Sequence, residues 1–139
     1  MIPQVTPEQA AETLRRKPDA AYLDVRSEAE FRTAHPRGAY NVPVVFFDAA
    51  QRPQRNPDFE RVVQATFPPD TALLVGCQSG VRSQHAAEIL RSLGYREVSN
   101  VAGGFGGSPA ARGWRDSGLA VESGDPPGRS YAELKQRPA

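Results

Sequence analysis

The strongest constraint on the fold of this chain is the alternation of short apolar runs with segments that carry helix start signals. A helix is predicted at residues 7–16, because Thr6 and Gln9 have the spacing of a capping box. Ser27 and Glu30 repeat that spacing before a helix of one to two turns. Strands are predicted at residues 21–25, 39–42, 72–76 and 98–101, of which 72–76 is a continuous apolar run. Strands that alternate with helices in this way are typical of a parallel sheet covered by helices, the α/β class.

Three further stretches complete the pattern. The Asn-Pro pair at residues 56–57 starts a predicted helix whose apolar side chains share one face: Phe59, Val62, Val63 and Phe67. Another helix is predicted at residues 84–93, with Ser83 as its N-cap and Gly94 just past its last turn. Residues 35–38 are expected to form a loop.

Length and composition fit one globular domain. The 139 residues are 39% hydrophobic and 24% charged, which suits a single core. Seventeen basic and sixteen acidic side chains leave a net charge of +1, so no bulk field favours nucleic acid or a membrane surface as a partner. Periodicity is lost after residue 122. Residues 1–122 are therefore interpreted as the domain, and residues 123–139 as a tail that is flexible in part, with a short helix at 131–136.

The chain shows no targeting signal at its first residues. No basic stretch followed by an apolar one begins the sequence, and no apolar run has the length of a bilayer span. The single cysteine excludes an internal disulfide, which is typical of a reducing compartment. A cytoplasmic location is predicted.

The candidate reactive group is Cys77, which lies between the apolar run at residues 72–76 and the predicted helix at 84–93. A short loop in this position can turn its amides inward and form an anion-binding nest at the positive end of the helix. Such a nest, with a cation nearby, stabilises a thiolate. The loop residues that would bind an anion, with Arg82 as the cation, are Gln78, Ser79, Gly80, Val81, Arg82 and Ser83. An inert buried thiol is the alternative, but Gly76 and Gly80 allow backbone conformations that a packing position does not need.

Two charged residues follow another predicted strand. Asp24 and Arg26 are expected close to Cys77, because the carboxyl ends of parallel strands share one edge of a sheet. They are interpreted as an ion pair that shapes the pocket rather than as groups that contact substrate. His35 and His85 are given no catalytic role, since a thiolate needs no separate base.

Four stretches of the chain occur in an order known from one protein family. They are Tyr22-Leu23-Asp24-Val25-Arg26, His35-Pro36-Arg37-Gly38-Ala39, Cys77 to Ser83, and Val101-Ala102-Gly103-Gly104-Phe105 with Trp114 downstream. With these motifs, residues 5–122 resemble the single-domain rhodanese family, in particular the plant-type thiosulfate sulfurtransferases. The resemblance implies a three-layer fold with a central, mostly parallel five-stranded sheet and helices on both faces. Residues 106–113 depart from the family pattern, so the helix expected there is broken or longer.

The resemblance also implies an activity. Cys77 would be the nucleophile, residues 78–83 would bind the substrate, and Asp24 and Arg26 would shape the pocket. A small donor such as thiosulfate would leave a sulfane sulfur on the cysteine as a persulfide, and a thiol or cyanide would accept it. Neither a metal nor a cofactor is required. The donor is less well defined than the reaction, because Gln78 and Ser79 stand where some two-domain thiosulfate enzymes have basic residues.

The cysteine loop is also consistent with three functions other than sulfur transfer by an enzyme. Cysteine phosphatases of the cell-cycle type share the strand, loop and helix but have one residue more between Cys and Arg, and the shorter loop here fits a sulfur atom better than a phosphoryl group. A persulfide carrier or interaction module, in which Cys77 receives sulfur from a protein partner, stays open as the alternative. A silent regulatory domain is disfavoured because both Cys77 and Arg82 are present.

Overall fold

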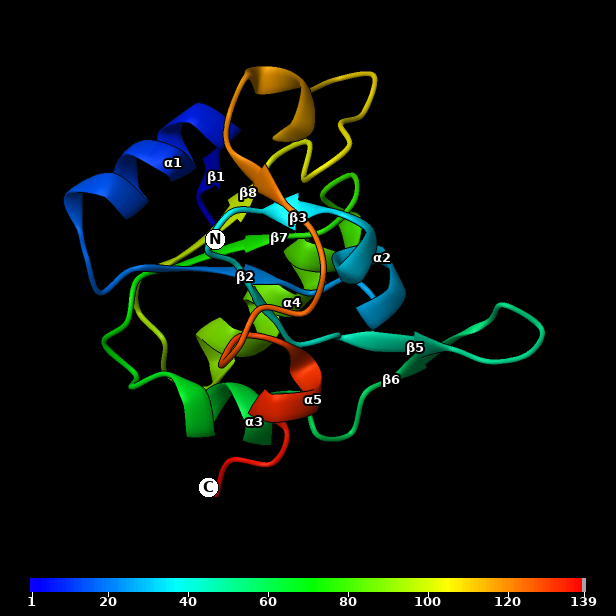
Figure 1. Ribbon diagram of the computed structural model, residues 1–139. Coiled ribbons are helices and arrows are strands. Elements are labelled where there is room, and N and C mark those ends of the chain that lie inside the picture. Colours follow the sequence, from blue (N-terminus) through cyan, green and yellow to red (C-terminus); the bar gives the residue numbers. More distant parts are fainter. Residues whose placement is uncertain (139) are drawn as a thin grey trace.

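A computed structural model describes residues 1–138 of the protein (Figure 1). At its centre is a five-stranded sheet in the order β1-β8-β7-β2-β4, in which every neighbouring pair is parallel. Its strands are β1 (Gln4–Val5), β2 (Ala21–Asp24), β4 (Tyr40–Asn41), β7 (Leu73–Gly76) and β8 (Val98–Val101). The α/β prediction is confirmed, and the sheet is parallel throughout. Ala139, the last residue of the predicted tail, lies outside the described residues.

Helices cover both faces of the sheet. They are α1 (Pro7–Arg16), α2 (Glu28–Thr33), α3 (Phe59–Thr66), α4 (Val81–Ser92), α5 (Tyr131–Leu134) and the 3₁₀ helix η1 (Arg115–Ser117). One buried cluster joins α3, α4 and α5 to one face, and a second joins α1 and α2 to the other. Figure 1 shows α3 and α4 below the strands β2 and β7. Side chains alternate along β2 and β7 between the two clusters. Leu23 and Val75 belong to the cluster with α3 and α4, whereas Tyr22 and Leu74 belong to the cluster with α1 and α2.

The predicted helix starts of α1 and α2 are confirmed. The Gln9 amide donates to Thr6 Oγ1 at 3.0 Å, and the Thr6 amide donates to Gln9 Oε1 at 2.9 Å. In α2 the Glu30 amide donates to Ser27 Oγ at 3.2 Å, and the Ser27 amide donates to Glu30 Oε1 at 3.1 Å. Both capping boxes satisfy amides that a helix leaves unpaired at its start.

Short strands outside the four predicted runs are the main difference from the sequence-based prediction. β1 was not predicted; it is two residues long and pairs only with β8. The predicted loop at residues 35–38 is wrong in part, because β3 (His35–Pro36) pairs with β9 (Val121–Glu122). Two-residue strands carry too few side chains to show an alternation, so only the pairing partner defines them.

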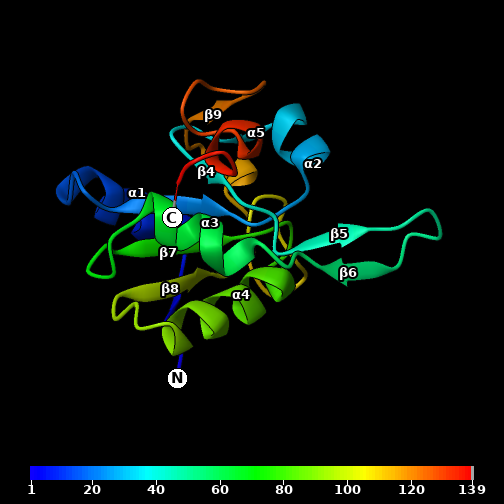
Figure 2. The ribbon, with the colours of Figure 1, turned by 90° about the horizontal axis from the view of Figure 1, so that it is seen from below.

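A hairpin of β5 (Val45–Phe47) and β6 (Pro53–Arg55) was also missed. Figures 1 and 2 both show it extending away from the body of the protein. Its turn is held by Asp48, whose Oδ1 accepts hydrogen bonds from the amides of Ala50 and Arg52, each at 2.9 Å. Since its strands are mostly exposed, they lack the buried alternation that marks a core strand.

The other predicted elements need small corrections. The helix predicted from residues 56–57 begins at Phe59, after a turn. Gly94 has φ +107 just past α4, as a helix-ending glycine should. Residues 106–113 form turns followed by η1 and contain no α-helix. The C-terminal helix is shorter than predicted, and its Tyr131 and Leu134 are buried in the core. The division of the chain at residue 122 stays a prediction.

Candidate active site

Cys77 lies at the carboxyl end of β7, the central strand of the sheet, as predicted. Its side chain is 1% exposed. The sulfur accepts hydrogen bonds from the backbone amides of Gly80 at 3.1 Å and Ser83 at 3.3 Å, and lies 3.3 Å from Ser83 Oγ. Main-chain N–H groups aimed at a sulfur favour its ionised form. The surroundings of Cys77 are therefore those of an anion nest, although the side chain is as buried as a packing residue.

The helix after the loop starts earlier than predicted. α4 begins at Val81, and its N-cap is Gly80, which has φ +108. The prediction of Ser83 as the N-cap is wrong, because Ser83 is buried in the first turn of α4. A left-handed glycine lets the chain reverse within three residues of the strand, so the helix starts close enough to the sulfur for its first amides to reach it.

The turn at residues 103–106, which follows β8, forms backbone hydrogen bonds to the cysteine loop. The Phe105 amide donates to the Cys77 carbonyl at 2.7 Å, and the Gly106 amide donates to the Gln78 carbonyl at 2.9 Å. Gly104 has φ +56, and a Cβ built there would lie 2.2 Å from the Cys77 carbonyl oxygen. A side chain at this position would displace the backbone of Cys77. The structure thus gives this turn a supporting role that sequence reasoning had not assigned.

Arg82 contacts Glu30 of α2, a partner that the sequence analysis did not identify. Its terminal nitrogens donate to the two carboxylate oxygens at 2.9 and 3.0 Å. Its guanidinium also lies 5.7 Å from the ring centroid of Phe47 in the β5–β6 hairpin. Burial lowers the pKa of Arg82, but the hydrogen bonds and charge of Glu30 and the charge of Cys77 raise it overall. Arg82 is therefore a permanent cation at the edge of the loop formed by residues 77–83, which we call the cradle. The Glu30 carboxylate holds it in place.

The pairing also changes the titration of Glu30. Burial raises the pKa of this carboxyl, but the hydrogen bonds from Arg82 and Ser27 outweigh burial and leave the pKa at about 2. A lowered folded-state pKa contributes stability that is fully present above the unfolded value of 4.5 and is lost as the pH falls through about 2.

Glu30→Gln should therefore lower the free energy of unfolding by about 1–2 kcal/mol at pH 7, a value reduced because the pair is partly in water. The difference from the natural protein should shrink as the pH is lowered from 5 towards 2. Urea unfolding at pH 7 and pH 3 would measure it. Glu60→Gln, which breaks the more exposed pair with Arg55, is the matched control and should cost less. Equal losses at both pH values would contradict the role assigned to Glu30.

Asp24 and Arg26 form a buried ion pair next to the cradle. Arg26 Nη2 donates to Asp24 Oδ2 at 2.8 Å, and the two side chains are 3% and 1% exposed. Arg26 also donates to the Ala34 carbonyl at 2.7 Å and to Gln78 Oε1 at 3.2 Å. This last bond joins the end of β2 to the cysteine loop. The ion pair is present, and its role in shaping the pocket stays a prediction.

A cavity of about 510 Å³ opens beside the cradle. It is lined by Arg26, Glu30, Thr33, Ala34, Gln78, Phe105 and Arg115. Two guanidinium groups lie near the Phe105 ring, that of Arg26 at 4.6 Å and that of Arg115 at 6.0 Å from its centroid. The lining therefore carries charges of both signs, because Glu30 also contributes to it.

The histidines have no place in this site. His35 is fully buried and stacks on Phe31 with ring centroids 3.6 Å apart, while its Nδ1 lies 2.6 Å from the Phe31 carbonyl oxygen. His85 is exposed on α4. Within residues 1–138, no group of three or more His, Cys, Asp or Glu side chains is arranged to hold a metal ion.

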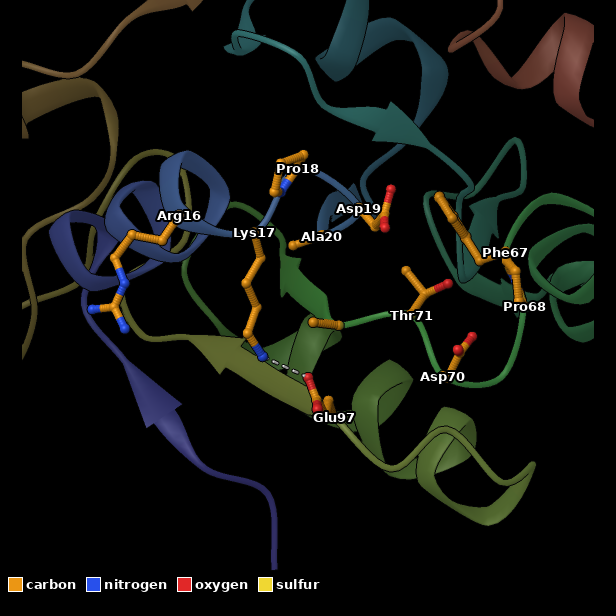
Figure 3. A pocket seen from close by; sticks show the side chains of 11 residues that line it. Arg16, Lys17, Pro18, Asp19, Ala20, Phe67, Pro68, Asp70, Thr71 and Glu97 are labelled. Carbon is orange, nitrogen blue, oxygen red and sulfur yellow. Dashed lines mark hydrogen bonds and ion pairs between the residues drawn. The ribbon is translucent and has the colours of Figure 1, made fainter.

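A second cavity, of about 670 Å³, lies at the amino ends of the strands, on the side of the sheet opposite to Cys77 (Figure 3). Residues that precede β2, β7 and β8 line it, among them Lys17, Phe67 and Thr71. Its labelled ion pair joins Lys17 Nζ to Glu97 Oε2 at 3.0 Å. Because Cys77 lies at the carboxyl ends of the strands, this cavity belongs to a different part of the protein, and its larger volume does not mark the reactive site.

Comparisons with known proteins agree with this arrangement. A family model described as a rhodanese-like domain matches residues 6–107. Thiosulfate sulfurtransferase 16, chloroplastic, from Arabidopsis thaliana is 36% identical over 102 residues, 73% of this chain and 79% of that protein. Thiosulfate sulfurtransferase 18 from the same plant is 41% identical over 86 residues, 60% of this chain and 62% of that protein.

Solved structures give the same result for the fold. The crystal structure of Rv0390 from M. tuberculosis superposes with a TM-score of 0.72 at 30% identity, covering 87% of this chain and 97% of the other. No helix among residues 1–138 is both long and apolar enough to cross a membrane. The fold class and the family resemblance read from the sequence are both confirmed.

Proposed function

Because the chain belongs to the rhodanese-like domain family, we propose that it is a sulfurtransferase that moves a sulfane sulfur through a Cys77 persulfide. Thiosulfate is the proposed donor, since the named relatives are thiosulfate sulfurtransferases. A thiol, or cyanide in an assay, is the proposed acceptor. The observation that carries the proposal is the pair of backbone amides, from Gly80 and Ser83, that donate to the Cys77 sulfur.

In the proposed first half-reaction, Cys77 acts as a thiolate held by these amides. The Cys77 thiolate attacks the outer sulfur of thiosulfate, a new S–S bond forms, and the donor's S–S bond breaks so that sulfite leaves with the electron pair. No proton has to move, which agrees with a site that lacks a paired base. The amides of the loop would hold the negative charge on the sulfur throughout.

The second half-reaction restores the enzyme. An acceptor thiolate attacks the outer sulfur of the persulfide, the S–S bond to Cys77 breaks, and the thiolate reforms in its nest while the acceptor leaves as a persulfide. Cyanide would leave as thiocyanate by the same route. Residues 78–83 would bind the donor and the persulfide, and Asp24 and Arg26 would keep the pocket in shape. The exchange predicts ping-pong kinetics.

The position of Arg82 supports sulfur transfer over phosphatase chemistry. A phosphatase arginine must bind the phosphoryl oxygens, whereas both ends of this guanidinium are bonded to Glu30. The low exposure of Cys77 supports a small donor as the first choice over direct exchange with a protein cysteine. The cytoplasm is proposed as the location from the single cysteine; among the relatives, two are named chloroplastic and one mitochondrial.

Intact-protein mass spectrometry after incubation with thiosulfate should show the gain of one sulfur atom. Cyanide should remove it, and prior alkylation of Cys77 should prevent it. An aryl phosphate should give no turnover. Failure to gain sulfur from thiosulfate or any other small donor would contradict the proposal. Labelling only by a protein persulfide would instead support the carrier function.

A further inference from the structure

A chain of polar side chains runs under the cradle from the first strand to the reactive sulfur. Ser83 Oγ lies 3.3 Å from Cys77 Sγ and 2.5 Å from Asn100 Oδ1. Asn100 Nδ2 in turn donates to Gln4 Oε1 at 2.8 Å and to the Gly80 carbonyl at 3.3 Å. Asn100 is 3% exposed and Ser83 is fully buried, so water does not compete for these bonds.

The contacts of Asn100 fix the direction of its amide. The Gly80 carbonyl can only accept a hydrogen bond, so the group that faces it must be the amide nitrogen. The carbonyl oxygen of the side chain therefore faces Ser83. Since that oxygen can only accept, the Ser83 hydroxyl must donate to it.

A serine hydroxyl has one hydrogen, and here two acceptors compete for it. While the hydrogen points to Asn100 Oδ1, the lone pairs of Ser83 face the sulfur and suit a neutral thiol that donates to them. When the thiol proton leaves to solvent, the hydroxyl can turn to the thiolate, but Asn100 Oδ1 then loses its donor inside the core. Leaving a buried acceptor unpaired is unfavourable.

We infer that Asn100 is a positioning residue that acts through Ser83 to set how readily Cys77 ionises. Competition from its carbonyl oxygen works against the thiolate, while its amide nitrogen holds the Gly80 loop from below. The inference builds on the proposed function, because the ionised sulfur is the proposed nucleophile. Ionisation can be measured without any sulfur donor, so the two ideas can fail separately.

Other charged and titratable groups around the sulfur stay in place when Asn100 is replaced. They come from β2, α2 and α4 and are Tyr22, Asp24, Arg26, Glu30 and Arg82. Substitution of Asn100 by an apolar residue removes no charge, so a change in ionisation reports the hydrogen bonds alone.

The test is a double-mutant cycle. Asn100→Leu, and Asn100→Val as a second variant suited to a strand, would each be made in the natural protein and in Ser83→Ala. The rate of Cys77 alkylation by iodoacetamide would be followed against pH. In the natural background the profile should move to lower pH by about half to one unit, the value of one hydrogen bond. In the Ser83→Ala background this movement to lower pH should be absent.

A different result is expected if the substitution acts only by removing the hydrogen bond from Asn100 to the Gly80 carbonyl. That loss would weaken an amide that donates to the sulfur, so the profile would move to higher pH, and equally in both backgrounds. Either that outcome or an unchanged profile in the natural background would overturn the inference. Gln84→Ala is the control, since Gln84 contacts Gln4 but not Asn100, and it should have no effect.

A measurement on the natural protein covers the case in which the Asn100 variants do not fold. The ¹³C chemical shift of the Asn100 side-chain carbonyl should change with pH at the midpoint of the Cys77 alkylation profile, because the carbonyl loses its donor when the sulfur ionises. The change should be absent in Cys77→Ser. A shift that stays constant through the ionisation of Cys77 would also overturn the inference.

Discussion

Cys77→Ser should abolish thiosulfate-dependent formation of thiocyanate, lowering the rate by about three orders of magnitude or more. A serine hydroxyl stays protonated in this site and cannot carry the sulfane sulfur. The oxygen fits the same space and can accept the amide hydrogen bonds of Gly80 and Ser83, so the fold should be kept. Initial rates of thiocyanate formation, together with circular dichroism of the variant, would provide the measurement.

His85→Ala is the matched control for this prediction. His85 is exposed on α4, the helix that follows the cysteine loop, so it is the side chain to remove when testing for a separate base near the loop. Full activity is expected, because the amide nest itself stabilises the thiolate. Substantial activity in the cysteine variant would exclude Cys77 as the carrier of sulfur, and loss of activity in the histidine variant would show that proton transfer is part of the reaction.

Asp24→Asn should lower the free energy of unfolding by about 3–5 kcal/mol, because it leaves the Arg26 charge buried without a counter-ion. An arginine guanidinium keeps its charge at neutral pH even without a partner, so Arg26 would stay charged in this variant. Activity should fall as well, since Arg26 orients Gln78 of the loop. Chemical denaturation at pH 7 would give the change in stability.

Two variants separate the buried pair from ion pairs in general. Asp125→Asn breaks the exposed pair with Arg32 and should change stability by less than about 0.5 kcal/mol. Asp24→Leu combined with Arg26→Met removes both buried charges and should recover a large part of the loss caused by Asp24→Asn. A loss below about 1 kcal/mol in Asp24→Asn would mean that the guanidinium reaches solvent without its partner.

The elements that were predicted correctly carry their information within a few residues. The capping boxes of α1 and α2 each join positions three apart, and the strand before Cys77 is a continuous apolar run. The cysteine loop is also contiguous, so its glycines and its short spacing to Arg82 could be read directly. The start of α4 was placed three residues late because the left-handed turn at Gly80 left no capping side chain to find.

The contacts that complete the site join distant positions. Glu30 meets Arg82 across 52 residues, and Asn100 meets Ser83 across 17. The sequence indicated Glu30 as the capping residue of α2, and that role gives no sign of its contact with Arg82. Asn100 is one of two neighbouring polar residues in β8, and nothing local set it apart from Ser99. The turn at Gly104 was visible as a glycine pair, but not as a support for the Cys77 carbonyl.

The sequence alone therefore determined the α/β pattern, the position of Cys77 at the end of a strand and the family resemblance, because helix caps, apolar runs and a contiguous loop are local properties of the chain. The partners of Arg82, Ser83 and the Cys77 carbonyl were decided only by the tertiary structure. The physical reason is that the parallel order β8-β7-β2 brings three strand ends to one edge of the sheet, and that order depends on pairings between distant segments that no local pattern specifies.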